Sequence, residues 1–308
     1  MTDEYQLQVS PRYSGSSLSL SKGRSGLIAR GLRDAVVLGE PSSPESADPL
    51  SEIRRLAGTG DAEAQLCLGL TYLYGEEAPQ DDAEALRWLR RAAEQGRPEA
   101  QRDLGCMYHM GRGGPRDYTE GFKWTRLAAE QGDSWAQFGL AVMYSDGLGT
   151  AQDRAEALKW LRLAAEQGEA AAQCNLGWMY AIGNGVPRDD GEAARWYRKA
   201  ADQGGAEAQL ALGEAYCFGE GVPEDADEAI VWYRKAADQG DTSAQLSLGR
   251  MYAGGRGIAQ DYVLAHMWFN LAGASGIENR DRIAREMTPE QVAEAQRLAR
   301  EWEPKTSQ

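Results

Sequence analysis

Two residue types that many enzyme and metal sites need are scarce in this sequence. Its 308 residues include two histidines, His109 and His266, and four cysteines. The cysteines fall at irregular intervals, whereas a disulfide framework would space them regularly. We therefore expect reduced thiols and a cytoplasmic location.

Long apolar runs are also missing. No stretch approaches the ~20 consecutive apolar residues that a membrane-spanning helix needs, so no integral membrane segment is expected. The N-terminus has neither an uninterrupted apolar segment nor a small-residue cleavage pattern, which disfavours a signal peptide. Basic residues number 33 against 47 acidic ones, and the formal net charge of −14 disfavours binding to nucleic acid or to an anionic membrane.

What the sequence has instead is one segment written six times. ALRWLRRAAEQG at 85–96 returns as GFKWTRLAAEQG, ALKWLRLAAEQG, AARWYRKAADQG and AIVWYRKAADQG, and more faintly as AHMWFNLAGASG. Rows of 36 residues from Asp61 to Gly276 align six times without insertion or deletion. Nine positions hold the same residue in every row. In the first row these residues are Ala64, Gln65, Leu68, Tyr72, Gly75, Asp81, Trp88, Ala92 and Gly96. Such self-similarity is typical of a solenoid, in which each repeat buries its apolar face against its neighbours.

The spacing within a row predicts two helices, which we name helix A and helix B. Ala64, Leu68 and Tyr72 lie four residues apart and share one face of helix A, which Gly75 should end in the left-handed conformation. Asp81, with Glu84 three residues later, predicts a capping box at the start of helix B.

Small residues and recurring aromatic residues should build the core between these helices. Ala64 and Ala92 are expected to let helices A and B approach closely. The tryptophan of helix B, first present as Trp88, is expected to be a core residue in every repeat.

Together these residues resemble the Sel-1-like repeat, a relative of the tetratricopeptide repeat that is longer by two residues. The resemblance rests on the patterns A-x-x-x-L-G-x-x-Y-x-x-G, G-V-P-x-D and A-x-x-W-x-x-K-A-A-x-Q-G, and it covers residues 61–276. It implies an all-α fold, a right-handed α/α superhelical solenoid that serves as a scaffold for protein–protein contact, frequently in bacterial signalling and envelope processes. One secreted branch of the family has a disulfide in each repeat, and this chain, with at most one cysteine per repeat, departs from it.

The segments on either side of the repeats are expected to cap the solenoid. Residues 49–60 align with a helix B and form a half-repeat, and residues 277–303 contain two capping helices before a tail at 304–308. The second of these helices should begin at Thr288, with Pro289 in its first position and a polar residue at Gln291.

Residues 1–48 differ from the repeats in composition, and three interpretations stay open. The segment is a mostly disordered extension with one amphipathic helix at 25–38, a docking element for the first repeat or for a partner, or an export signal that is not cleaved. PSSPESADP at 41–49 has the composition of a linker.

If the fixed positions pack the core, the variable positions of helix A should face a partner. By resemblance to tetratricopeptide repeats, this face lines a concave groove. Eight residues are predicted to contact a protein or peptide there: Arg102, Met110, Trp135, Phe138, Trp178, Ile182, Phe218 and Arg250. Aromatic residues and arginines dominate binding energy at interfaces. The alternative is that Trp135, Phe138 and Trp178 fill gaps between adjacent A helices.

No catalytic, metal or cofactor site is predicted. Cys106 and His109 lie three residues apart on a helix A, but a cysteine nucleophile also needs an orienting group and an oxyanion site, which the neighbouring sequence does not supply. The glycine-rich loops lack a following Lys-Ser/Thr and are predicted to be turns. The sequence therefore favours a monomeric, non-enzymatic adaptor. The alternatives are an accessory or hydrolase-like activity on the repeat scaffold and a purely structural spacer.

Overall fold

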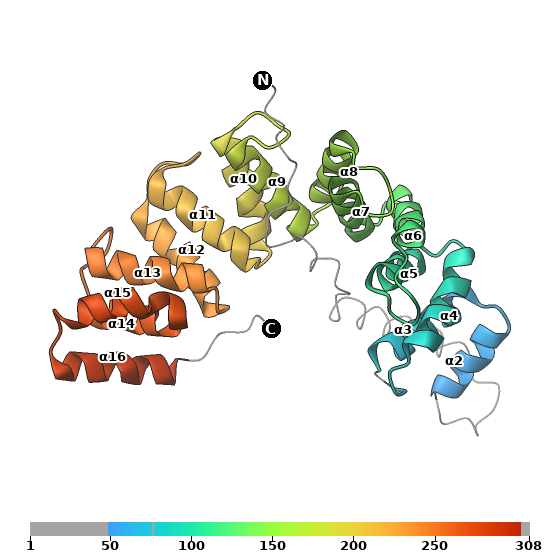
Figure 1. Cartoon of the computed structure of the whole chain (residues 1–308), viewed down its shortest axis with the longest axis horizontal. Coiled ribbons are helices and arrows are strands. Elements are labelled where there is room, and N and C mark those ends of the chain that lie inside the picture. Colours follow the sequence, from blue (N-terminus) through green and yellow to red (C-terminus); the bar gives the residue numbers. More distant parts are fainter. Residues whose placement is uncertain (1–48, 76, 303–308) are drawn as a thin grey trace. The chain divides into compact units, whose positions relative to one another are not determined.

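A computed structural model describes residues 49–75 and 77–302, and within these ranges the chain forms fifteen α-helices and no strand. The predicted helix at 25–38 and the tail at 304–308 lie outside the described residues. The chain divides into two compact units, with the boundary in the sequence between Gln167 and Gly168. Figure 1 shows the paired helices of each unit.

The first unit contains a leading helix, α2 (Pro49–Gly58), and three A–B pairs. The pairs are α3 (Ala62–Tyr74) with α4 (Asp82–Glu94), α5 (Pro98–Met110) with α6 (Tyr118–Glu130), and α7 (Ser134–Asp146) with α8 (Arg154–Glu166). Helix α2 packs Ile53 and Ala57 against Ala64 and Leu68 of α3. Burial of these side chains covers the apolar face of the first repeat.

The second unit contains three further pairs and two terminal helices. The pairs are α9 (Ala170–Ile182) with α10 (Asp190–Asp202), α11 (Ala206–Phe218) with α12 (Ala226–Asp238), and α13 (Thr242–Gly254) with α14 (Tyr262–Leu271). A 3-10 turn, η1 (Gly273–Gly276), leads to α15 (Ile277–Ala284) and α16 (Pro289–Glu301). Helix α16 begins with the predicted Thr288 cap, and Trp302 packs edge-on against Trp268, with ring centroids 6.1 Å apart.

The ends of the helices follow from the recurring glycine and aspartate. All six A helices end at a glycine in the left-handed region, such as Gly75 with φ of 71°. All six B helices begin at an aspartate whose carboxylate accepts hydrogen bonds from backbone N–H groups of the first turn, as Asp81 does from Ala83 and Glu84. These bonds satisfy N–H groups that a helix cannot satisfy internally.

The capping-box prediction is right for the aspartate, which caps helix B, and wrong for the glutamate, which does not bind the backbone of the cap residue. The Glu84 side chain does not return to the Asp81 backbone, because the Asp81 N–H donates to the carbonyl of Tyr72 at 2.9 Å. The Glu84 carboxylate instead accepts from the indole Nε1 of Trp88 at 3.0 Å, and the same bond recurs at Trp124 and Trp232. A largely buried indole N–H needs an acceptor, and this glutamate supplies it.

The tryptophan positions agree with the core prediction in four repeats and not in two. Trp88, Trp124, Trp232 and Trp268 are buried, whereas Trp160 and Trp196 are half-buried. A side chain that keeps part of its surface in water gains less from burial. These two rings therefore stabilise their repeats less than the other four.

Glycines in the middle of the A helices set the separation of the helix pair in five of the six repeats, a role that was expected of alanine. A Cβ added at Gly213 would lie 2.7 Å from Cδ1 of Tyr233, and one at Gly69 would lie 2.7 Å from Cγ of Leu89. These distances are shorter than van der Waals contact, so the B-helix side chain lies directly on the glycine backbone.

A glutamine ladder explains why Gln65 recurs in all repeats. The Gln65 side-chain amide donates to the carbonyl of Ala57 in the preceding helix at 3.1 Å, and the Gln95 amide donates to Gln65 Oε1 at 2.8 Å. The same pair of bonds recurs at Gln101 and Gln131 and at Gln209 and Gln239. Each buried amide is thereby satisfied, and each repeat is joined to the helix before it.

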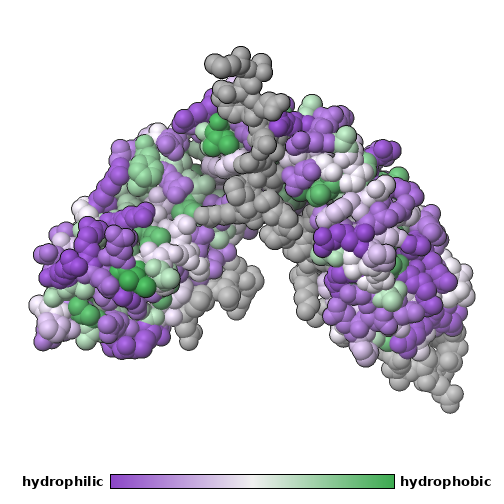
Figure 2. All heavy atoms as spheres, viewed as in Figure 1, coloured by the Kyte–Doolittle hydropathy of each residue, from purple (hydrophilic) through white to green (hydrophobic). Residues whose placement is uncertain are grey.

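Hydrophilic residues make up most of the coloured surface on the face drawn in Figure 2. Figure 2 shows apolar residues on the drawn face as small separate patches among hydrophilic ones. Among the residues that the structure describes, five large apolar side chains are more than a third exposed: Leu163, Ile182, Phe218, Val231 and Ile277. No helix within the described ranges has the length and apolar character needed to cross a lipid bilayer.

Candidate partner-binding surface

The structure contradicts the predicted exposure of Phe138. This side chain is 1% exposed. Leu66, which occupies the same repeat position as Arg102 and Phe138, is also fully buried. Leu66 and Leu70 share an apolar cluster with Leu104 and Met107 of the next A helix. Adjacent A helices contact each other through this flank, so its residues pack the core and do not face a partner.

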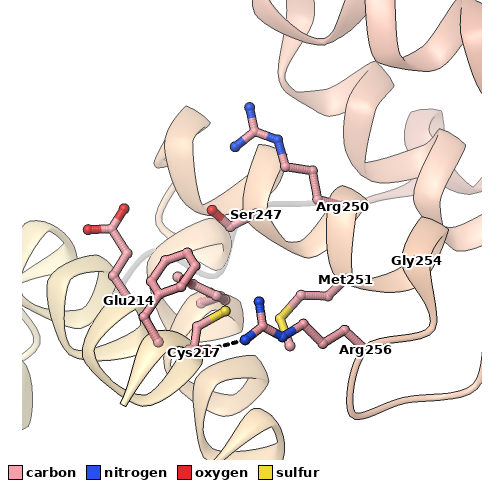
Figure 3. Close-up of a pocket in the computed structure, with 9 residues that line it drawn as sticks. Glu214, Cys217, Ser247, Arg250, Met251, Gly254 and Arg256 are labelled. Atoms are coloured by element: carbon pink, nitrogen blue, oxygen red, sulfur yellow. Dashed lines mark hydrogen bonds between the residues drawn. The ribbon is translucent and has the colours of Figure 1, made fainter. Parts of the chain in front are cut away.

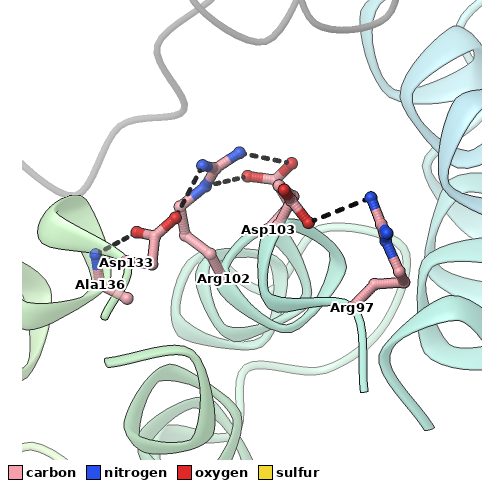
Figure 4. Close-up of polar contacts among 6 residues, drawn as sticks. Arg97, Arg102, Asp103, Asp133 and Ala136 are labelled. Carbon is pink, nitrogen blue, oxygen red and sulfur yellow. Dashed lines mark hydrogen bonds and ion pairs between the residues drawn. The ribbon is translucent and has the colours of Figure 1, made fainter. Parts of the chain in front are cut away.

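Arg102 is committed to a buried ionic cluster in the first unit (Figure 4). Its guanidinium donates to both carboxylate oxygens of Asp103, at 2.9 and 3.2 Å, and to Asp133 at 3.2 Å. Asp133 in turn accepts from the Ala136 N–H and caps α7. With its side chain 11% exposed, Arg102 joins α5 to the start of α7.

Burial and the neighbouring charges shift the pKa values of the groups in this cluster in opposite directions. Burial opposes the charge of Arg102, but the two carboxylates outweigh it and raise the pKa of the guanidinium. Burial raises the pKa of Asp103 above its usual range even though Arg102 lies beside it. The cluster is therefore a structural ion pair, and the prediction that Arg102 contacts a partner finds no support. Met110 and Trp135, the other predicted residues of this unit, are half-buried at the surface.

The remaining four predicted residues lie together in the second unit. Trp178 and Ile182 line a pocket of about 190 Å³ between α9, α10 and α11. Phe218 and Arg250 line a pocket of about 450 Å³ between α11, α12 and α13. We name the surface formed by these two pockets the A-helix face.

Apolar side chains stand exposed at the rims of both pockets. Ile182 is 51% exposed and Phe218 is 60% exposed. The bases of the pockets are aromatic, since Tyr197 lines the first and Tyr233 the second, and both are buried. Burial raises the pKa of both phenols above their usual range.

The second pocket also carries two guanidinium groups (Figure 3). Arg256 donates to the carbonyl of Cys217 at 2.7 Å and pairs with Glu224 at 2.7 Å, which fixes it at the edge of the pocket. Arg250 extends from α13 and is exposed, and within the described residues it makes no hydrogen bond or ion pair.

The Sel1 repeat family model matches six consecutive segments, at residues 62–96, 98–133, 136–169, 170–205, 206–241 and 242–277. The chain belongs to the Sel1 repeat family. Proteins of this family are generally scaffolds for protein interaction. A search of curated proteins found no match.

Two solved Sel1 repeat structures are similar to this chain. A protective antigen of uropathogenic Escherichia coli with an SLR fold is 32% identical, with a TM-score of 0.75 over 92% of this chain. The match spans 64% of that antigen's length. A Sel1 repeat protein from Oxalobacter formigenes is also 32% identical, with a TM-score of 0.67, and the match covers 80% of this chain and 96% of that one.

The cysteine and histidine of the second Sel1 repeat do not form an activated pair. Cys106 is buried, and burial raises the pKa of its thiol well above the usual value. His109 packs edge-on against Tyr118 with centroids 5.1 Å apart, and burial lowers its pKa. Across the described part of the chain, no group of three or more His, Cys, Asp or Glu side chains is arranged to hold a metal ion.

Most of the charged residues of the two pockets were not predicted from the sequence. Asp190 and Glu220 line the first pocket, and Arg256 lines the second. Glu220 and Arg256 follow the end of helix A, in a loop interpreted only as a turn. The sequence did contain a signal that these two residues could be functional, because they occupy the same repeat position and carry opposite charges.

Proposed function

We propose that this Sel1 repeat protein is a non-enzymatic adaptor within a bacterial signalling or regulatory complex, and that it binds a peptide or protein partner on the A-helix face of its second unit. The observation that carries this proposal is the exposure of Ile182 and Phe218 beside two pockets with aromatic bases. Burying an apolar side chain of this size contributes roughly 1.5–3 kcal/mol. Two such residues on adjacent helices provide an anchor for a partner.

Affinity capture from the native cell lysate tests the proposal. We expect the wild-type chain to retain a partner that an Ile182→Ser/Phe218→Ser variant loses. A Leu163→Ser/Val231→Ser variant is the matched control, because these side chains are 37% and 47% exposed and lie on B helices. The control should retain the partner.

The outcome separates the adaptor from its alternatives. A partner retained equally by all three chains would move the binding surface away from Ile182 and Phe218. A chain that retains nothing specific would favour the structural spacer. The Cys106 thiol does not support an enzymatic alternative, because it is buried and burial raises its pKa.

A further inference from the structure

One side of the larger pocket lacks a side chain. The volume of this pocket, about 450 Å³, falls within the range of about 300–1,000 Å³ typical of ligand sites, whereas the neighbouring pocket of about 190 Å³ does not. Gly254, the last residue of α13, lines the larger pocket, and no atom lies within 4 Å of a Cβ built on it. The other five repeats carry a side chain at this position: Tyr74, Met110, Asp146, Ile182 and Phe218. The space that such a side chain would enter therefore stays open in the sixth repeat.

The lining of this pocket favours an aromatic ligand. Cys217, Tyr233 and Met251 form its base, and all three are buried. A methionine sulfur makes favourable contacts with aromatic rings, and a tyrosine ring packs well against a second ring. Phe218 forms an exposed wall, and the guanidinium of Arg256 lies over its ring, 5.6 Å from the centroid. This contact holds the wall in place before a ligand binds.

Arg250 is the charged residue of this pocket that a ligand can pair with. It is exposed, and it makes no hydrogen bond or ion pair within the described residues. Arg256 is already paired with Glu224, and Glu214 already interacts with another group of the protein. Arginine binds a carboxylate through two parallel hydrogen bonds. A carboxylate is therefore the ligand group expected at Arg250.

The position of Arg250 indicates which ligand residue carries this carboxylate. Figure 3 shows the guanidinium of Arg250 beyond Ser247, away from Cys217 and Met251 at the base of the pocket. A ring that reaches the base keeps its own main chain at the rim. The side chain of a neighbouring Asp or Glu then extends from the rim to Arg250.

We infer that this pocket binds an aromatic side chain of a partner protein, and that Arg250 binds the side-chain carboxylate of an Asp or Glu next to it. The ring enters the space beside Gly254 and contacts Phe218 and Tyr233. Because this chain carries a net charge of −14, a single carboxylate suits the site better than an acidic run. The inference rests on the proposed function and specifies the chemistry of the partner.

Saturation-transfer NMR of short peptides with the full-length chain tests the inference, because it measures affinities as weak as millimolar. The probe is acetyl-Gly-Ser-Phe-Asp-Ser-Gly-amide. We expect the dissociation constant to rise at least about tenfold when Phe is replaced by Ala, since ring burial supplies most of the binding. Replacing Asp by Asn should raise it at least about threefold, since an exposed ion pair contributes less. Tighter binding of a peptide that ends in a free Phe carboxylate would overturn the assignment to an Asp or Glu side chain.

An isoleucine in place of Gly254 tests whether the open space is the binding site. Gly254→Ile gives the sixth repeat the residue of the fourth and should weaken the probe at least about tenfold. Gly58→Ile is the matched control, because Gly58 is also an exposed last residue of a helix with no atom within 4 Å of its added Cβ. The control should bind the probe as the wild type does. Melting curves by circular dichroism check that both variants are folded.

A neutral residue in place of Arg250 tests the carboxylate contact. Arg250→Gln should remove the preference for the Asp peptide over the Asn peptide and keep the preference for Phe over Ala. Arg162→Gln removes the same charge from an exposed B-helix position of the first unit and should keep both preferences.

Two results would overturn the inference. One is equal affinity for the Phe and Ala peptides, and the other is no saturation transfer to any peptide at millimolar concentration. Affinity capture separates such a failure from a failure of the proposed function. If Gly254→Ile retains a partner that Ile182→Ser/Phe218→Ser loses, the proposed function stands and only the ligand of this pocket is wrong.

Two other occupants of the pocket have their own signatures. Glu4 and Tyr5 are an acidic and an aromatic residue side by side in the chain's own N-terminal segment. If Glu4→Gln/Tyr5→Ala bound the probe at least about tenfold more tightly than the wild type, the pocket would belong to that segment. Self-association of the wild type in sedimentation velocity that Gly254→Ile abolishes would assign the pocket to a second copy. Either result would overturn the assignment to a partner protein.

Discussion

Because the side chain of Gly213 is a single hydrogen atom, two helices can approach each other closely at this residue. It lies in the middle of α11 against the ring of Tyr233, and Tyr233 is 2% exposed. A methyl group there would lie 2.7 Å from Cδ1 and 2.8 Å from Cε1 of the ring. To relieve this contact, the buried ring would have to shift into the pocket that it lines, or the two helices would have to separate.

We expect Gly213→Ala to lower the stability of the second unit by about 1–3 kcal/mol through overpacking. The measurement is urea denaturation followed by circular dichroism. Gly254→Ala is the control, since no atom lies within 4 Å of its added Cβ and alanine is the better helix former. A variant Gly213→Ala as stable as the wild type would show that the helix pair tolerates a wider separation.

The sequence contained the signal for this glycine position. A helical glycine occurs there in five of the six repeats, as Gly69, Gly105, Gly177, Gly213 and Gly249, and only Ala141 replaces it. Glycine is a poor helix former, so its recurrence within a helix points to a close approach. The burial of Phe138 could not be predicted from the sequence in the same way. Periodicity shows which residues share a face, but not which neighbouring element covers it.

At the scale of the helix, the aspartate caps decide where each B helix begins. Asp225 accepts a hydrogen bond from the N–H of Glu228 at 3.0 Å, and the Glu228 side chain turns to the indole of Trp232. The aspartate and the glutamate thus serve different partners, one the helix backbone and the other the core. Sequence spacing predicted the cap but could not separate these two roles, because a capping box has the same spacing.

We expect Asp225→Ala to destabilise the second unit by about 1 kcal/mol, the usual effect of losing an N-cap acceptor. Asp227→Ala is the control, because Asp227 lies in the first turn of the same helix without being its cap residue. Thermal melting should show a lower midpoint for Asp225→Ala than for Asp227→Ala. Equal midpoints would mean that water satisfies the first-turn N–H groups equally well.

At the scale of the whole molecule, stability should be local. In a solenoid each repeat contacts mainly its neighbours, so a disturbance in one repeat weakens those next to it and fades with distance. The six repeats and their family were predictable because register and recurring residues are properties of the sequence itself. The two pockets were not, since they depend on which side chains leave space between adjacent helices.

We expect hydrogen exchange measured by mass spectrometry to show this locality. Gly213→Ala should accelerate amide exchange in α11 and α12, while exchange in α3 and α4 stays as in the wild type. The wild-type chain under the same conditions is the reference. Uniform acceleration across all repeats would show that the chain opens as a single cooperative body.

The glutamine ladder has a consequence for how such chains change length. The Gln65 amide binds a main-chain carbonyl of the preceding helix, and its other partner is Gln95 of its own repeat. A carbonyl is present whatever residue stands there, so this hydrogen bond does not depend on which two repeats meet. Loss or duplication of one 36-residue segment would leave every rung of the ladder satisfied. This bond therefore sets no restriction on the gain or loss of whole repeats, and any restriction lies in the side chains that pack beside it.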